Sequence, residues 1–139
     1  MASEDLADTL AGFALFADLE RAQLEAITHT LDEQWFGAGQ RILRQGLGGS
    51  GFHFIIEGEA SVRIDGEETS KLSRGDFFGE LSILLGEPPS ADIVALTPLR
   101  CLVLPAPELR GWLLGLPAVT FRMLHAELRR LRAASRWLT

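Results

Sequence analysis

The sequence predicts a mainly β protein whose strands form an antiparallel sandwich or barrel flanked by helices. Three observations lead to this class: glycines crowd the centre of the chain, apolar residues alternate there, and helical spacing of apolar residues is found at both ends. Eleven of the fourteen glycines lie between Gly37 and Gly86. Many short strands with regularly spaced glycine turns are typical of an antiparallel sandwich or barrel. We expect one domain over residues 1–139, with helices at 1–32, a β-barrel at 33–105 and helices at 106–139.

The N-terminal zone reads as helical because its apolar residues recur every three or four positions. Leu6, Leu10 and Phe13 follow this spacing, and Leu24 and Ile27 repeat it. Such spacing places the side chains on one face of a helix, which can then pack on the rest of the domain.

The central zone shows the alternation of a strand in place of helical spacing. Phe52, Phe54 and Ile56 fall on one face of an extended segment. Further along, Asp65-Gly66 is a strong signal for a two-residue hairpin turn. This zone is therefore expected to form antiparallel strands joined by tight turns.

The last zone is helical again, with Pro117 placed well as the first residue of a long helix. Four arginines of this helix lie off its apolar stripe: Arg122, Arg129, Arg132 and Arg136. The stripe consists of Phe121, Leu124, Leu128, Leu131 and Leu138.

Composition and charge exclude several classes of protein. The chain is 47% apolar and 23% charged, and no apolar run approaches the roughly 18 residues that a transmembrane helix needs. The net charge of −6 argues against a nucleic-acid partner, although residues 117–139 carry +4. The N-terminus lacks the features of a secretory signal, and the single Cys101 cannot form an internal disulfide. We expect a cytoplasmic protein without a membrane partner.

The histidines do not form a catalytic or metal-binding pattern. His29, His53 and His125 fall one in each zone of the chain. A cupin-type metal site needs a second histidine two positions after the first, and Ile55 stands there. The sequence also lacks a Walker motif and a dinucleotide fingerprint. We expect no enzymatic activity, no metal and no cofactor.

A short helix from Glu80 to Leu85 is predicted to interrupt the strands. A helix N-terminus offers unpaired N–H groups and a partial positive charge, which suit an anion, and Gly79 allows a close approach to the backbone. A carboxylate beside an anion site suits the hydroxyl of a sugar. The pairing indicates a ligand with both a phosphate and a sugar; the alternative is that Glu80 only caps its own helix.

Four stretches resemble the cyclic nucleotide-binding domain, the family of the catabolite activator protein and the regulatory subunits of cAMP-dependent kinase. The resemblance covers roughly Leu10 to Arg132 and implies an eight-stranded jelly-roll barrel with flanking helices, in which Gly39, Gly46 and Gly58 are turn glycines. The stretches are, in order, LFADLERAQLEAI, FGAGQRILRQG, FHFIIEGEASV and LSRGDFFGELSILLGEPPSADIVALTPLRCLVLP.

By this resemblance, the phosphate-binding cassette spans residues 78–93 and the candidate ligand is cAMP or cGMP. Glu80 would hold the ribose 2′-hydroxyl. Main-chain N–H groups at the start of the short helix and at Ser90 and Ala91 would hold the cyclic phosphate. The expected ligand-binding residues are Gly79, Glu80, Leu81, Pro89, Ser90, Ala91 and Asp92.

The cassette departs from the family pattern where the phosphate binds. Pro89 replaces the arginine that pairs with the phosphate, and Asp92 replaces a threonine or serine. An arginine contributes about two charge-assisted bonds of roughly 1.5–3 kcal/mol each, so its loss weakens affinity by on the order of two to four decades. Glu87 and Asp92 are expected to repel an anion further. Other arginines of this zone are candidate replacements: Arg41, Arg44, Arg63 and Arg74.

The leading expectation is a small, non-enzymatic regulatory protein that senses a cyclic nucleotide. The alternative is a degenerate domain that keeps the fold, binds no cyclic nucleotide and acts as a protein-interaction or adaptor module. By resemblance, the C-terminal helix would mediate a homodimer or bind a protein partner, and Trp137 would act as a lid over the base or as a dimer contact. No DNA-binding domain is expected.

Overall fold

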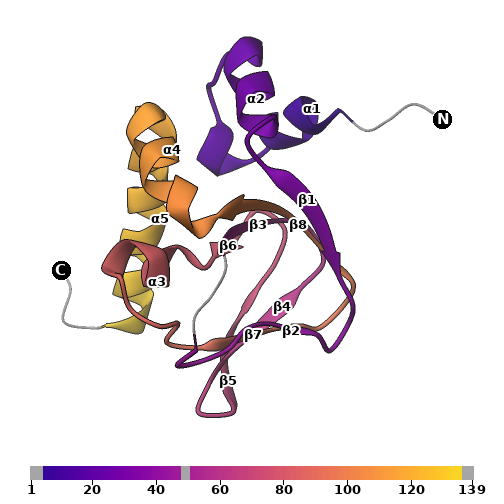
Figure 1. Cartoon of the computed structure of the whole chain (residues 1–139), viewed down its shortest axis with the longest axis vertical. Coiled ribbons are helices and arrows are strands. Elements are labelled where there is room, and N and C mark those ends of the chain that lie inside the picture. Colours follow the sequence, from indigo (N-terminus) through magenta and orange to yellow (C-terminus); the bar gives the residue numbers. More distant parts are fainter. Residues whose placement is uncertain (1–4, 48–50, 136–139) are drawn as a thin grey trace.

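The computed structural model of the protein describes residues 5–47 and 51–135. Helices precede and follow the strands, and one short helix interrupts them (Figure 1). The helical elements are α1 (Leu6–Ala11), η1 (Ala14–Phe16), α2 (Arg21–Thr28), α3 (Glu80–Leu85), η2 (Ala106–Glu108), α4 (Leu109–Gly115) and α5 (Pro117–Ala134). The strands are β1 (Asp32–Phe36), β2 (Arg41–Leu43), β3 (Gly51–Glu57), β4 (Ala60–Ile64), β5 (Glu67–Leu72), β6 (Phe77–Phe78), β7 (Asp92–Ala95) and β8 (Leu99–Pro105).

The strands pair antiparallel in two four-stranded sheets, in the orders β1-β8-β3-β6 and β2-β7-β4-β5. Figure 1 shows the first sheet beside the helices and the second at the bottom of the molecule. The predicted mix of flanking helices and antiparallel strands is confirmed. Closure of the two sheets into one barrel stays a prediction. The strands begin at Asp32 and end at Pro105, within one residue of the predicted limits.

The β4–β5 hairpin has the turn that the sequence predicts. Ile64 pairs with Glu67 across it. The two residues between them, Asp65 and Gly66, have φ angles of 52° and 83°. Two successive positive φ values define the turn type whose twist suits a two-residue hairpin, and Asp-Gly is favoured there.

Strand β3 lies at the centre of the fold because both of its faces are buried. Phe52 and Phe54 pack in the cluster that includes the helices, where Phe54 makes edge-on contacts with Phe13 and Phe16 at centroid distances of 5.0 and 5.1 Å. Ile55 points the other way, into a second cluster that joins the two sheets. The alternation along β3 therefore holds the N-terminal helices and the second sheet on opposite sides of one strand.

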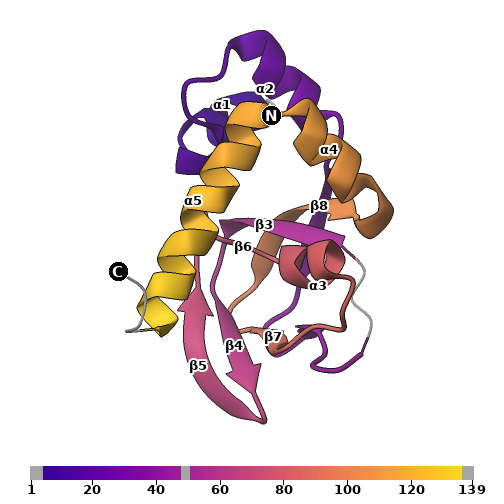
Figure 2. The ribbon, with the colours of Figure 1, turned by 90° about the vertical axis from the view of Figure 1, so that its left-hand side faces the viewer.

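Helix α5 packs on the domain through a face other than its predicted apolar stripe. Its fully buried side chains are Val119 and Met123. Figure 2 shows α5 running down one side of the molecule, from the N-terminal helices toward β5. The described members of the stripe are all exposed: Phe121 at 71%, Leu124 at 53%, Leu128 at 54% and Leu131 at 53%. Leu138 lies outside the described residues.

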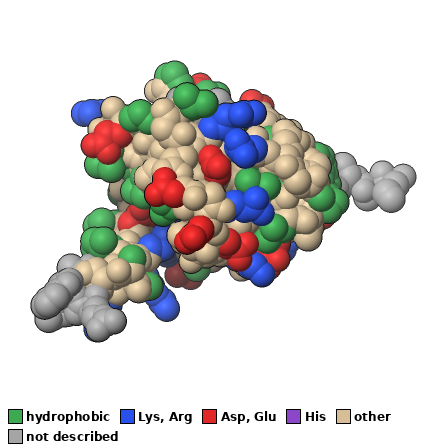
Figure 3. Space-filling model, turned by 90° about the horizontal axis from the view of Figure 1, so that it is seen from below, with side chains coloured by type: hydrophobic (Ala, Val, Ile, Leu, Met, Phe, Trp, Pro, Cys, Tyr) green, Lys and Arg blue, Asp and Glu red, His purple; other side chains and the backbone are tan. Residues whose placement is uncertain are grey.

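The face of the molecule opposite the N-terminal helices carries charges of both signs. Seen from below, Lys and Arg side chains are interspersed with Asp and Glu, with apolar side chains between them (Figure 3). An interspersed surface of this kind does not form a field of one sign.

We expect Gly58→Ala to lower the free energy of unfolding by about 2–5 kcal/mol, because a left-handed non-glycine residue costs about 1–2 and overpacking about 1–3 kcal/mol. Gly58 has φ 97°, and a Cβ there would lie 2.3 Å from the carbonyl oxygen of Pro98. Gly66→Ala is the matched control, because Gly66 has φ 83° and open space around it. Urea denaturation measures both variants, and equal losses would contradict the steric argument.

Candidate functional site

Helix α3 starts and stops at glycines in left-handed conformation. Gly79 precedes the helix with φ 93°, and Gly86 follows it with φ 67°. A Cβ on Gly79 would lie 2.2 Å from the carbonyl oxygen of Gly51, so this position is closed to any other residue. The predicted helix from Glu80 to Leu85 is confirmed, and it is held against β3 by this close approach.

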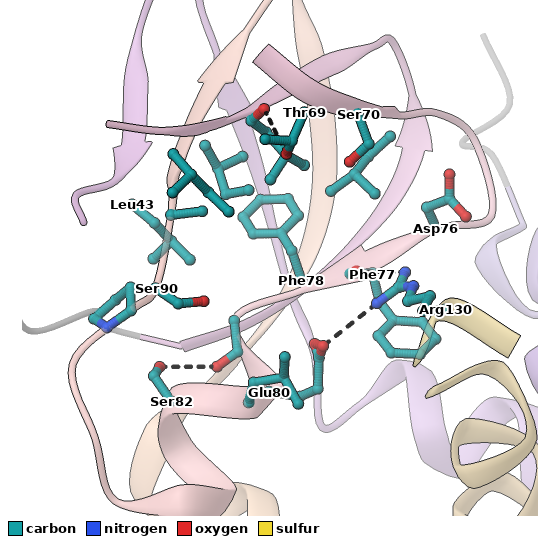
Figure 4. Close-up of a pocket in the computed structure, with 18 of the residues that line it drawn as sticks. Leu43, Thr69, Ser70, Asp76, Phe77, Phe78, Glu80, Ser82, Ser90 and Arg130 are labelled. Carbon is teal, nitrogen blue, oxygen red and sulfur yellow. Dashed lines mark hydrogen bonds and ion pairs between the residues drawn. The ribbon is translucent and has the colours of Figure 1, made fainter. Parts of the chain in front are cut away.

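A cavity of about 640 Å³ lies beside α3, between the two sheets and the end of α5 (Figure 4). Its volume falls within the roughly 300–1,000 Å³ that small-molecule sites occupy. Six of the expected ligand-binding residues line it: Gly79, Glu80, Leu81, Pro89, Ser90 and Ala91. Further lining residues are Leu43, Val62, Ile64, Thr69, Ser70, Lys71, Leu72, Asp76, Phe77, Phe78, Ser82, Ile93, Arg130, Ala133 and Ala134.

Asp92 was expected at the ligand, and it does not belong to the lining. One of its oxygens accepts a hydrogen bond from the main-chain N–H of Gln45 at 2.7 Å, and the other lies 3.7 Å from Nε of Arg41. Ala91 and Ile93, its neighbours in sequence, do line the cavity, as expected when successive side chains alternate along a strand. The Asp92 carboxylate thus faces Arg41 and Gln45. It therefore repels an anion in the cavity less than we expected.

Glu80 is the buried acidic group of the cavity, with a side chain 3% exposed. Its Oε1 lies 3.4 Å from Nη1 of Arg130. Its Oε2 is buried and has no hydrogen-bond partner among the described residues. Burial, followed by the nearby Glu127 carboxylate, raises the pKa of Glu80 to about 8, against the opposing effect of Arg130. An unpaired buried oxygen is costly, so Oε2 is an exceptional polar atom of this site.

Arg130 of α5 forms part of this site, and the sequence analysis missed it. Its Nη2 donates to the carbonyl oxygen of Phe77 at 2.8 Å, and its guanidinium lies 4.3 Å from the centroid of the Phe77 ring. Its Nη1 lies 3.2 Å from Oε1 of Glu127 as well as near Glu80. Arg130 lies two turns after the buried Met123 and shares its face, but only the structure shows that this is the face that α5 packs on the domain.

The arginines that we considered as replacements lie elsewhere in the structure. Arg41 is near Asp92, and Arg63 donates to the hydroxyl of Ser61 at 3.1 Å. Arg74 donates to the carbonyl oxygen of Ile56 at 2.6 Å. Neither these three nor Arg44 belongs to the described lining, whose basic residues are Lys71 and Arg130.

His53 packs against Phe78, a residue of the cavity wall. Its ring stacks on that of Phe78, which lines the cavity, at a centroid distance of 4.7 Å, and its Nδ1 lies 3.0 Å from the carbonyl oxygen of Gly51. Burial lowers the pKa of His53 to about 4, so the ring is neutral at pH 7. Within residues 5–47 and 51–135 there is no cluster of three or more His, Cys, Asp or Glu that could hold a metal ion. No described helix is long and apolar enough to cross a membrane.

We expect the free energy of unfolding to carry a contribution that falls as the pH rises from about 4.5 to about 8, and Glu80→Gln to remove this contribution. The folded protein binds the Glu80 proton more tightly than the unfolded chain, in which the pKa is 4.5. This contribution is therefore complete below pH 4.5 and is lost as the pH rises through the folded pKa of about 8. One proton gives a slope of at most about 1.4 kcal/mol per pH unit. Urea denaturation across this range measures both proteins, and equal slopes would contradict the raised pKa.

Comparisons with known proteins agree with this geometry. The family described as "Cyclic nucleotide-binding domain" matches residues 33–114. The chain is 36% identical over 118 residues to a cGMP-dependent protein kinase from Eimeria tenella, and 41% identical over 85 residues to a cAMP-dependent protein kinase regulatory subunit from Mycosarcoma maydis. These matches cover 85% and 58% of this chain, and only 12% and 16% of those relatives.

Among solved structures, the catabolite activator protein of Thermus thermophilus superimposes with a TM-score of 0.76 at 26% identity. The superposition covers 86% of this chain and 59% of that one. Fold, cavity and sequence match agree, and the chain belongs to the cyclic nucleotide-binding domain family.

Proposed function

We propose that this protein is a non-enzymatic regulatory domain that binds a cyclic nucleotide, cAMP or cGMP, in the cavity beside α3. The observation that carries the proposal is Glu80, a buried acidic residue that lines a cavity of about 640 Å³ and has one oxygen, Oε2, without a hydrogen-bond partner among the described residues. A ribose 2′-hydroxyl would donate to this oxygen. The position of Asp92 also favours binding. Its carboxylate accepts a hydrogen bond from the main-chain N–H of Gln45 and lies outside the lining, so it repels the phosphate less than we expected.

The phosphate of the ligand would meet main chain and hydroxyl groups. Ser90 and Ala91 line the cavity where the chain leads into β7, and Gly79 and Leu81 line it at the start of α3. N–H groups in such turns are suitable partners for an anion. Pro89 also lines the cavity but has no N–H group to offer.

The proposal includes a single domain in which the two sheets close into a jelly-roll barrel around the cavity. It is supported by the second apolar cluster, which joins Leu43 and Ile93 of one sheet to Ile55 and Phe78 of the other. A cytoplasmic location fits the buried Cys101, whose pKa is raised by burial and which therefore stays a protonated thiol.

The second candidate function is that of a degenerate domain, which keeps the fold and acts through protein contacts. Pro89 favours it, because this residue is buried in the cavity wall and brings no charge there. The loss of an arginine at this position would weaken phosphate binding by roughly 100- to 10,000-fold.

We expect calorimetric titration with cAMP or cGMP to give a saturable isotherm with a dissociation constant below about 1 mM. Glu80→Gln, which keeps the shape of the side chain and cannot ionise, should weaken binding by about 10- to 100-fold when measured at about pH 9, above the Glu80 pKa of about 8, because hydrogen bonds to charged groups contribute about 1.5–3 kcal/mol. Heat that appears only in Pro89→Arg, with the native chain silent up to about 1 mM, would establish the degenerate domain instead.

We further propose a homodimer formed by the exposed stripe of α5. Phe121, Leu124, Leu128 and Leu131 are spaced by three, four and three residues, which is the repeat of a two-stranded coiled coil. A second copy of the same helix would bury this stripe along its whole length. Trp137, the expected lid or dimer contact, lies outside the described residues.

We expect light scattering to give a dimer mass for the intact protein and a monomer mass for Leu128→Glu, because a buried charge at the centre of the stripe is costly. Arg129→Glu is the matched control, since Arg129 is exposed, adjacent and off the stripe. A monomeric native protein, or dimers in both variants, would overturn this assignment.

A further inference from the structure

We infer that the cavity beside α3 binds an uncharged ribonucleoside, such as adenosine or guanosine, more tightly than the cyclic nucleotide of the same base. The inference rests on the proposed function, because it uses the same cavity and the same carboxylate. It adds a preference for a ligand without charge. The described lining keeps an acceptor for a ribose hydroxyl. Of its two basic residues, Arg130 is bonded to other groups of the protein and Lys71 belongs to β5.

Arg130 is committed to contacts within the protein. Its guanidinium reaches Glu80 at 3.4 Å, Glu127 at 3.2 Å and the carbonyl oxygen of Phe77 at 2.8 Å. Binding a phosphate through Arg130 would break contacts that compensate two carboxylates, of which Glu80 is buried. The guanidinium is therefore a poor partner for an incoming anion.

Lys71, the other basic residue of the described lining, belongs to β5. Figure 4 shows Thr69 and Ser70 of this strand across the cavity from Glu80 and Ser82 of α3. Lys71 thus belongs to the strand that lies across the cavity from the cassette helix. The wall next to the helix is formed by Pro89, which offers neither a charge nor an N–H donor.

An acidic residue makes the cavity unfavourable for an anion. Asp76 belongs to the lining, whereas Glu80, whose pKa is raised to about 8 by burial, is largely protonated at neutral pH and adds little repulsion. A phosphate that enters must leave water, and its charge must then be compensated by the site. Like charges nearby raise that cost. An uncharged nucleoside carries the same ribose and base without this cost.

Neutral hydroxyl groups suit the polar atoms that the cavity presents. The unpaired Oε2 of Glu80 is buried and accepts a hydroxyl hydrogen. The hydroxyl of Ser82 donates to the carbonyl oxygen of Gly79 at 3.3 Å, which leaves its own oxygen free to accept, and Ser90 also lies in the lining. A nucleoside brings three ribose hydroxyls, each both donor and acceptor, where a cyclic nucleotide brings one and a charged ring.

The remaining walls suit a flat base. Leu43, Phe78 and Ile93 line the cavity with apolar surface, and Figure 4 shows the Phe78 ring at its centre. Sites for small molecules are predominantly apolar with a few placed polar groups, and this lining has that character. Burial of the base supplies affinity that does not depend on the phosphate.

The test is calorimetric titration of the intact protein with adenosine, guanosine, cAMP and cGMP under one buffer condition. We expect each nucleoside to bind at least about tenfold more tightly than its cyclic nucleotide, since the charged ligand has an uncompensated phosphate. 2′-Deoxyadenosine should bind about 10- to 100-fold more weakly than adenosine, because the hydroxyl bonded to Glu80 is gone.

Pro89→Arg should reverse the preference. The new guanidinium adds two charge-assisted bonds to a phosphate, so cAMP should gain roughly 100- to 10,000-fold, while adenosine changes by less than about threefold. Pro88→Arg is the matched control, because Pro88 is adjacent, exposed and outside the lining. It should leave the preference as in the native protein.

The outcomes separate this inference from the proposed function. Native protein that binds cAMP more tightly than adenosine keeps the proposed function and overturns the inference. Binding of adenosine without measurable binding of cAMP supports the inference and overturns cyclic nucleotide sensing. If no nucleoside binds to the native chain, the inference fails, whether or not Pro89→Arg binds cAMP. Circular dichroism of each variant verifies that it is folded.

Discussion

The contact between the buried Glu80 carboxylate and the Arg130 guanidinium is the interaction on which the site depends. The two residues are 50 positions apart, and their pairing brings the first turn of α3 and the last part of α5 to one side of the cavity. Arg130 also bonds to the carbonyl oxygen of Phe77 in β6, so the strand, the short helix and the long helix meet at one guanidinium. Arg130 is the one cation beside this acid among the described residues that line the cavity near it, so its removal would leave the buried Glu80 without the partner that opposes the rise of its pKa.

The departures from the family pattern have different structural consequences. Asp92 turns away from the cavity and ties β7 to β2 through Arg41, and to the segment that follows β2 through Gln45. Pro89 stays in the wall, and its carbonyl oxygen accepts a hydrogen bond from the main-chain N–H of Gly46 at 2.8 Å. Asp92 thus contributes to contacts between strands, whereas Pro89 alters the chemistry of the cavity wall.

Features set by neighbouring residues were predicted well from the sequence. The limits of α3 follow from glycines at both ends, and the β4–β5 turn follows from Asp65 and Gly66. Contacts between distant segments were not predicted. Arg130 gives no local sign of its partner Glu80, because α5 must first be docked before its register against the cavity is known. The orientation of Asp92 likewise depends on the register of β7 against β2.

Periodicity along α5 showed that an apolar stripe exists, but it did not show which face the domain covers. The face of α5 that packs on the domain has only two buried residues, Val119 and Met123, among those described. The longer apolar stripe is exposed to solvent. Helical spacing reports that side chains lie together and carries no information on what lies opposite them.

Helix α5 serves two surfaces at once. Arg130 and Ala133 contribute to the wall of the cavity, and Leu128 and Leu131 belong to the exposed outer stripe one turn away. A rigid helix cannot shift on one side without shifting on the other. If the proposed dimer and the proposed ligand both bind at these surfaces, any energetic link between them is reciprocal. The affinity for the ligand would then differ between dilute and concentrated protein, by the same factor by which the ligand promotes self-association.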